Sequence, residues 1–105
     1  LQGVDAVLVP TANMTGFDEV QNLLVPARAC ENRVFVAYAN ACGSEGRTHY
    51  GGLSTVAGPH GAALTRADRA PGLWLATLDH TALQPARQNS YLNDRRTDLY
   101  GPLVD

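Results

Sequence analysis

Runs of apolar and polar residues along the chain predict an α/β fold. Val4 to Val9 is apolar except for Asp5, a pattern typical of a strand covered on both faces, and we expect Pro10 to end it. Val34 to Ala39 is rich in β-branched and aromatic residues and predicts a central, buried strand that ends at Asn40.

Between these two strands, apolar residues recur with a helical period from Asp18 to Arg33. Asp18 and Glu19 are well placed in the first turn, because acidic side chains interact favourably with the positive end of the helix dipole. Pro26 interrupts the pattern, since proline has no N–H to donate to the preceding turn. It either kinks one helix or stands at the first position of a second, short helix.

The second half of the chain predicts short strands separated by turns. Gly58 to Gly61 is a strong turn signal that joins two short strands into a hairpin. Further on, Asp79 or Thr81 is placed to cap a short helix that runs to about Gln88. The other expected segments are a loop at 42–46, a tight turn at 51–52, strands at 53–57, 62–65 and 73–78, a turn at 68–72, and an extended, polar tail at 90–105 that packs on something.

The composition of the chain excludes several classes of protein. The chain has 105 residues, enough for one core, and it is 45% hydrophobic but only 17% charged, which excludes a disordered tail. Its formal net charge is −2, so the chain lacks the excess of positive charge that attracts nucleic acid or an anionic membrane. No apolar run approaches the roughly 20 residues of a membrane span, so we expect a soluble, cytoplasmic protein. Leu1-Gln2-Gly3 resembles a helix end without an initiator methionine, which suggests the middle of a longer protein.

The usual motifs for hydrolytic and metal chemistry are missing from the sequence. Neither Ser44 nor Ser54 has the glycine frame of a nucleophile elbow, and Ser54 is expected to be a structural hydroxyl. No cysteine or histidine pair has metal-ligand spacing and no glycine pattern cradles a phosphate, so we expect neither a metal nor a cofactor. Cys30 lies beside Glu31, whose carboxylate disfavours a thiolate. For Glu31 itself, a structural hydrogen-bonding role and a role in a site both stay open.

A series of short motifs runs through nearly the whole chain in a fixed order. They are Val9-Pro10-Thr11-Ala12, Val25-Pro26-Ala27-Arg28-Ala29 with Glu31-Asn32, Val36-Ala37-Tyr38-Ala39-Asn40 with Gly43 and Glu45-Gly46, Tyr50-Gly51-Gly52-Leu53-Ser54, Pro59 with Gly61, Asp79, and Tyr91-Leu92-Asn93-Asp94-Arg95-Arg96 with Asp98-Leu99-Tyr100. In order and spacing, the series resembles the nitrilase superfamily of carbon–nitrogen hydrolases.

This resemblance implies a four-layer α-β-β-α sandwich whose subunits pair through a helical layer, with a C-terminal tail that often reaches toward the partner. We therefore expect a homodimer or a larger homo-oligomer. Members of the family attack a nitrile or amide carbon with a cysteine, helped by a glutamate base and by a lysine that stabilises the oxyanion. A thiolate needs a neighbouring base, and the tetrahedral intermediate needs a positive donor.

The chain departs from the family pattern at the catalytic residues. The family's nucleophile stands in a Cys-Tyr-Asp-like turn before the strand that corresponds to Val4 to Val9, and that turn is absent. All eight basic residues are arginine, so the family's lysine is absent too, and neither Cys30 nor Cys42 stands at the nucleophile's position. Residues 1–105 therefore resemble the C-terminal portion of one longer hydrolase domain, with no catalytic residue of their own.

What the resemblance leaves in this chain is the supporting half of a site. At matching positions, Thr11, Ala12, Asn13 and Asn40 would line the substrate pocket, and Glu31 would anchor the nearby helix through hydrogen bonds. The tail pattern resembles members that hydrolyse small aliphatic amides or N-carbamoyl amines. The competing hypothesis is a non-catalytic binding or dimerisation module with the same fold.

Overall fold

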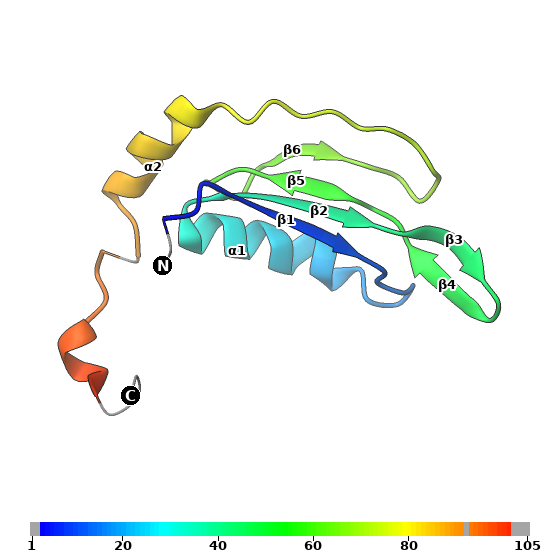
Figure 1. The fold of residues 1–105 in the computed structure, drawn as a ribbon, viewed down its shortest axis with the longest axis horizontal. Helices are drawn as coiled ribbons and strands as arrows, with labels where there is room; N and C mark the ends of the chain where they lie inside the picture. Colours follow the sequence, from blue (N-terminus) through cyan, green and yellow to red (C-terminus); the bar gives the residue numbers. More distant parts are fainter. Residues whose placement is uncertain (1–2, 92, 102–105) are drawn as a thin grey trace.

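The computed structural model describes residues 3–91 and 93–101 and shows a mixed sheet with a helix on one face (Figure 1). The order of its four strands is β1-β2-β5-β6, with β1 parallel to β2 and the other neighbours antiparallel. The strands are β1 (Ala6–Thr11), β2 (Phe35–Asn40), β5 (Thr55–Ala57) and β6 (Ala63–Arg66). The expected α/β class is confirmed.

The first strand differs from the prediction in length and burial. It continues through Pro10 to Thr11, because β1 is an edge strand with β2 as its one neighbour, and an edge strand tolerates a residue without an N–H. Val7 is 40% and Leu8 is 71% exposed, so the expected cover on both faces is not present in the described part of the chain. Burial of apolar runs depends on neighbouring elements, which the sequence of the strand does not contain.

The central strand β2 and the helix before it follow the sequence pattern closely. A π-helical turn, η1 (Val20–Leu24), leads into α1 (Val25–Asn32), and Pro26 lies in the first turn of α1. Residues 19–32 are helical without a break, so Pro26 does not stand at the first position of a separate helix; it is the second residue of α1, and the π-helical turn lies directly before it. α1 packs on β2, and its buried residues form one cluster with those of the sheet: Val25, Ala29, Val34, Val36, Tyr38 and Ala57.

Two predicted segments of the second half are wrong. The expected loop at 42–46 is instead a hairpin of β3 (Cys42–Glu45) and β4 (Thr48–Gly51), which projects beyond β2 (Figure 1). The expected strand at 73–78 pairs with no strand among the described residues, and Leu73 is 86% exposed. Backbone hydrogen bonding explains both differences. β3 pairs with β4, whereas residues 73–78 pair with no described strand.

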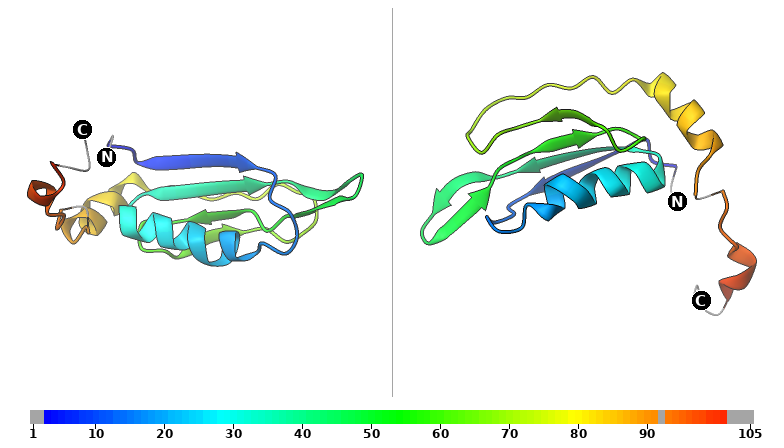
Figure 2. Two further views of the ribbon diagram at one scale, coloured as in Figure 1. Left: turned by 90° about the horizontal axis from the view of Figure 1, so that it is seen from below. Right: turned by 180° about the vertical axis from the view of Figure 1, so that it is seen from behind.

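The remaining elements agree with the prediction or extend it. The hairpin of β5 and β6 around the turn at 58–61 is confirmed, although β5 begins only at Thr55. Asp79 accepts the Thr81 N–H and so caps η2 (His80–Ala82), which continues into α2 (Leu83–Gln88). The tail contains η3 (Thr97–Leu99) and extends away from the sheet in both views of Figure 2. No helix within 3–91 or 93–101 is long and apolar enough to cross a membrane.

Candidate functional site

Polar side chains gather where β1 and β2 end. The two strands are parallel, so their carboxyl ends lie at the same edge, and Thr11 stands opposite Asn40 in the register. The Asn13 backbone N–H donates to Asn40 Oδ1 at 2.6 Å, and Asn40 Nδ2 donates back to the Asn13 carbonyl at 3.1 Å. In open α/β sheets, this edge is where ligands bind. The structure therefore brings the predicted residues of loop 11–13 together with Asn40.

The turn at residues 51–53 lies against these strand ends and has a strained backbone. Asn40 Nδ2 also donates to the Gly52 carbonyl at 3.0 Å, and the Gly51 N–H donates to the Asn13 carbonyl at 2.9 Å. Gly52 has φ +63°, and a Cβ there would lie 2.9 Å from Arg69 Cα. The next residue, Leu53, also has a positive φ of 56°. A left-handed backbone at close approach to another segment requires glycine at position 52.

Gln21 is a member of this site that the sequence reasoning missed. Its side chain is fully buried, with Nε2 donating to the Gly52 carbonyl at 3.0 Å and Oε1 accepting from Asn13 Nδ2 at 3.2 Å. A signal was present, because Gln21 precedes the buried residues Val25 and Ala29 by one and two i,i+4 steps. A glutamine in line with the buried stripe of a helix indicates a buried polar partner.

Ser54 and Asp18 lie around these strand ends and contact the residues that form the site. Ser54 Oγ accepts the Asn40 N–H at 2.8 Å, so it is a structural hydroxyl, as expected. Asp18 pairs with Arg69 at 2.6 Å, and Arg69 also donates to the Gly51 carbonyl at 3.1 Å. The hydrogen bond from Arg69 lowers the pKa of the Asp18 carboxyl and raises that of the Arg69 guanidinium. The Arg69 side chain is 55% and the Asp18 side chain 32% exposed, so solvent weakens this pair.

The other predicted residues lie as follows. Thr11 is half-buried and accepts the Ala41 N–H at its carbonyl, while Ala12 is exposed. Glu31 is on the last turn of α1, where it pairs with Arg28 on the exposed surface, and the structure does not bring it to the amides at the strand ends.

Neither cysteine lies in a reactive arrangement among the described residues. Cys30 and Cys42 are free and half-buried, and Arg33 Nη1 donates to Cys30 Sγ at 3.8 Å. Within residues 3–91 and 93–101, no three histidine, cysteine, aspartate or glutamate side chains are grouped as metal ligands. The strand-end site is thus built of amides, a hydroxyl and backbone groups, which are hydrogen-bonding groups and not nucleophiles or metal ligands.

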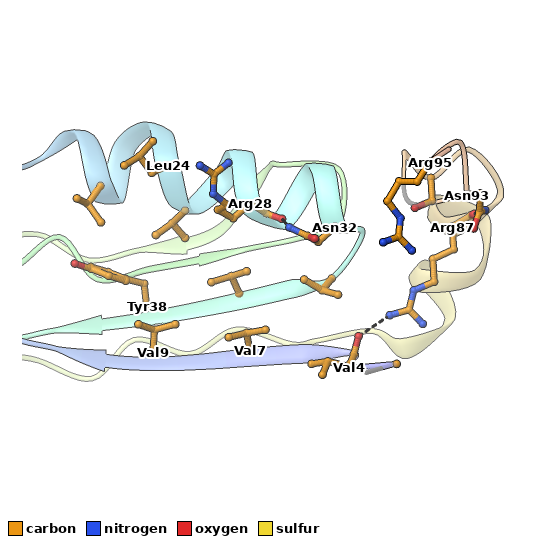
Figure 3. A pocket seen from close by; sticks show the side chains of 16 residues that line it. Val4, Val7, Val9, Leu24, Arg28, Asn32, Tyr38, Arg87, Asn93 and Arg95 are labelled. Carbon is orange, nitrogen blue, oxygen red and sulfur yellow. Dashed lines mark hydrogen bonds between the residues drawn. The ribbon is translucent and has the colours of Figure 1, made fainter. Parts of the chain in front are cut away.

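A separate, mostly apolar groove of about 810 Å³ lies between α1 and the start of the sheet (Figure 3). Val7, Val9 and Leu24 line its length, and Arg87 closes one end by donating to the Val4 carbonyl at 2.9 Å. Asn13, Gln21 and Asn40 are not among its lining residues. The groove is an uncovered apolar face beside β1 and not part of the strand-end site.

The comparison with family models decides the classification. The model described as carbon-nitrogen hydrolase matches residues 1–88. The chain belongs to the carbon-nitrogen hydrolase family. A relative from Pseudomonas protegens, named "Hydrolase in pqqF 5'region", is 43% identical over 104 residues. Mouse deaminated glutathione amidase is 42% identical over 84 residues, or 77% of this chain and 26% of that protein.

Solved structures of the carbon-nitrogen hydrolase family show the same fold. A variant of the amidase from Nesterenkonia sp. AN1, with the acetamide moiety of fluoroacetamide added covalently at its active-site cysteine, matches 97% of this chain at a TM-score of 0.81 and 39% identity. Another variant of that amidase, in complex with butyramide, matches at a TM-score of 0.77. The nitrilase-superfamily fold expected from the sequence is confirmed, and α1 with the four-stranded sheet forms one helical and one sheet layer of the sandwich.

The Pseudomonas protegens relative matches 98% and the Nesterenkonia amidase 97% of this chain, but the chain covers only part of each of those proteins. The chain spans about 36% of the Pseudomonas protegens relative and 36% of the Nesterenkonia amidase. Three of the relatives are named as a hydrolase or an amidase.

Proposed function

We propose that residues 1–105 form the C-terminal third of an amidase that hydrolyses a small aliphatic amide or an N-carbamoyl amine. The observation that carries this proposal is the match of 97% of the chain, at a TM-score of 0.81, to an amidase whose cysteine takes an acetamide group. The strand-end amides support it, because they are polar groups at the edge of the sheet where α/β proteins bind ligands.

In this proposal the chemistry uses a cysteine, a glutamate and a lysine that precede residue 1. The thiolate attacks the amide carbonyl carbon, and the tetrahedral intermediate collapses to a thioester as the C–N bond breaks. The leaving nitrogen takes a proton and departs as ammonia or an amine. Water, deprotonated by the glutamate, then attacks the thioester, which releases the acid and restores the thiol. No cofactor takes part.

Residues of this chain serve that reaction by binding and positioning. Thr11, Ala12 and Asn13 form the strand-end loop that lines the substrate pocket. Asn40 holds this loop, because both N–H groups of its side chain are already committed to the Asn13 and Gly52 carbonyls. Glu31 steadies the last turn of α1 through Arg28. Homodimer formation through the helical layer and a cytoplasmic location stay predictions.

The test is an ammonia-release assay on the product of the complete reading frame that contains residues 1–105. We expect turnover of acetamide, butyramide or an N-carbamoyl amine, and no turnover by the 105-residue chain alone. A frame that lacks an upstream Cys-Tyr-Asp-like turn, or a product without activity on any of these compounds, would contradict the proposal and favour a binding module. The same assay with an aromatic nitrile compares the turnover of a larger substrate with that of the small amides, and so measures the selectivity between them.

A further inference from the structure

The buried side chain of Gln21 determines which end of the Asn13 amide is available to a ligand. Asn13 Nδ2 donates both of its hydrogens, to the Phe17 carbonyl at 3.1 Å and to Gln21 Oε1 at 3.2 Å. No described group donates to Asn13 Oδ1. Among the described residues, Arg33 Nε is the one buried side-chain polar atom without a partner, so Asn13 Oδ1 is open to solvent. Asn13 therefore presents a hydrogen-bond acceptor.

The backbone carbonyl of Gly52 sets the orientation of the Gln21 side-chain amide. The Gly52 carbonyl is only an acceptor, so the group of Gln21 that meets it at 3.0 Å is Nε2. The other end of the same amide, Oε1, is then an acceptor and faces Asn13 Nδ2. Reversing either amide would set two acceptors or two donors against each other. Three groups in series, Gly52, Gln21 and Asn13, thus transmit one orientation from the turn to loop 11–13.

Burial makes this orientation firm. Gln21 is fully buried, and a buried amide that loses a partner keeps the full cost of its desolvation. Gly52 cannot move away, because its turn has a positive φ and lies against Arg69. The Asn13 backbone is held independently by Asn40, so Gln21 acts on the Asn13 side chain and not on the path of the loop.

We propose that Gln21 is a positioning residue that fixes Asn13 Oδ1 as the acceptor for an N–H of the substrate. The inference rests on the proposed amidase function and deepens it. Primary amides and N-carbamoyl groups carry N–H donors, and a site that presents an acceptor selects them over groups of similar shape without a donor. Gln21 does not touch the substrate and acts through Asn13 alone.

The first experiment compares two substitutions by the same apolar side chain in the complete enzyme. Gln21→Met keeps the length of the side chain and removes both hydrogen bonds of Gln21, so Asn13 Nδ2 keeps only its bond to the Phe17 carbonyl and the amide is held less firmly. We expect KM for acetamide to rise about fivefold or more, with kcat within about twofold, since a contact made equally in the ground and transition states affects binding only. The control, Asn22→Met, changes the exposed neighbour on the same helical turn and should leave both constants unaltered.

The second experiment makes the orientation depend on pH. In Gln21→Glu, the protonated carboxyl donates to the Gly52 carbonyl and accepts from Asn13, as glutamine does, whereas the carboxylate has only acceptors. Burial raises the pKa of such a carboxyl. Asp18 and Arg69 form an ion pair beside Gly51, next to this amide; the pKa of Asp18 is lowered from 3.8 and that of Arg69 is raised, so neither titrates between pH 5 and 9. We expect KM of Gln21→Glu, divided by that of the native enzyme, to be near one at low pH and to rise with pH.

The outcomes separate the inference from the proposed function. No activity in the native enzyme would overturn the proposed function. An active native enzyme whose KM is unchanged in Gln21→Met, or whose Gln21→Glu variant shows a flat KM ratio between pH 5 and 9, would overturn the role of Gln21 alone. If Gln21→Met fails to fold, the pH series of Gln21→Glu decides, because a purely structural loss would lower the fraction of active enzyme and kcat, not KM.

Discussion

The carboxylate of Asp5, at the start of the first strand, pairs with the guanidinium of Arg87 in α2 at 3.0 Å. His80 approaches the second oxygen of the same carboxylate at 3.0 Å. Arg87 also donates to the Val4 and Arg33 carbonyls, so one side chain joins α2 to the beginning of β1 and to the turn before β2. Asp5 interrupts the apolar run from Val4 to Val9 but lies directly before β1, where Arg87 and His80 accommodate its carboxylate.

The first prediction concerns acid stability. Hydrogen bonds from Arg87 and then His80 lower the pKa of Asp5 from its ordinary 3.8. A carboxyl with a lowered pKa in the folded state contributes stability that is complete above 3.8 and is lost as pH falls through the folded value. We expect Asp5→Asn to reduce the melting temperature at pH 7 and to flatten its fall below pH 4. A melting curve that responds to acid equally in both proteins would contradict this role.

The second prediction concerns the turn at Gly52. Gly52→Ala combines a left-handed backbone with a Cβ 2.9 Å from Arg69 Cα, whereas Gly43→Ala has φ +79° but no atom within 4 Å of its Cβ. We expect Gly43→Ala to cost about 1 to 2 kcal/mol of unfolding free energy and Gly52→Ala clearly more. Chemical denaturation of the two variants measures the difference, and equal losses would show that the close approach has no effect.

The third prediction concerns Ser54. Removing its hydroxyl leaves the half-buried Asn40 N–H without the acceptor that it now meets at 2.8 Å. We expect Ser54→Ala to reduce the unfolding free energy by about 1 to 3 kcal/mol. The control, Ser44→Ala, removes an exposed hydroxyl that contacts His49 on the β3–β4 hairpin and should cost about 0.5 kcal/mol or less. The idea fails if the two variants are equally stable in urea.

The fourth prediction concerns the thiols of this chain. Neither Cys30 nor Cys42 belongs to the strand-end site, and no described carboxylate or histidine is hydrogen-bonded to either sulfur. We therefore expect the double variant Cys30→Ala, Cys42→Ala of the complete amidase to keep kcat within about twofold, since each of these thiols lacks the neighbouring base that activates a nucleophile. A loss of more than a hundredfold, with the fold intact by circular dichroism, would place the nucleophile in this chain.

Local patterns in the sequence were sufficient for several elements. The β-branched run of β2, the helical period before it, the turn at Gly58 to Gly61 and the cap at Asp79 all depend on residues within a few positions of one another. The period of side-chain direction and the chemistry of turns act over that range, so one sequence predicts them. The family resemblance implied that Asn13 and Asn40 lie together, and the parallel pairing of β1 with β2 is the structural reason that they do.

Other features were decided only by the tertiary structure. The β3–β4 hairpin and the unpaired segment at 73–78 depend on whether a backbone partner lies alongside, which no local pattern contains. The partner of the buried Gln21 amide is the Gly52 carbonyl, 31 residues away along the chain, so a local pattern could indicate that Gln21 is buried but not what it binds. The sequence by itself determined the family, the helix and the central strand. Contacts between distant segments determined the polar site, because hydrogen-bond partners are set by the folded arrangement.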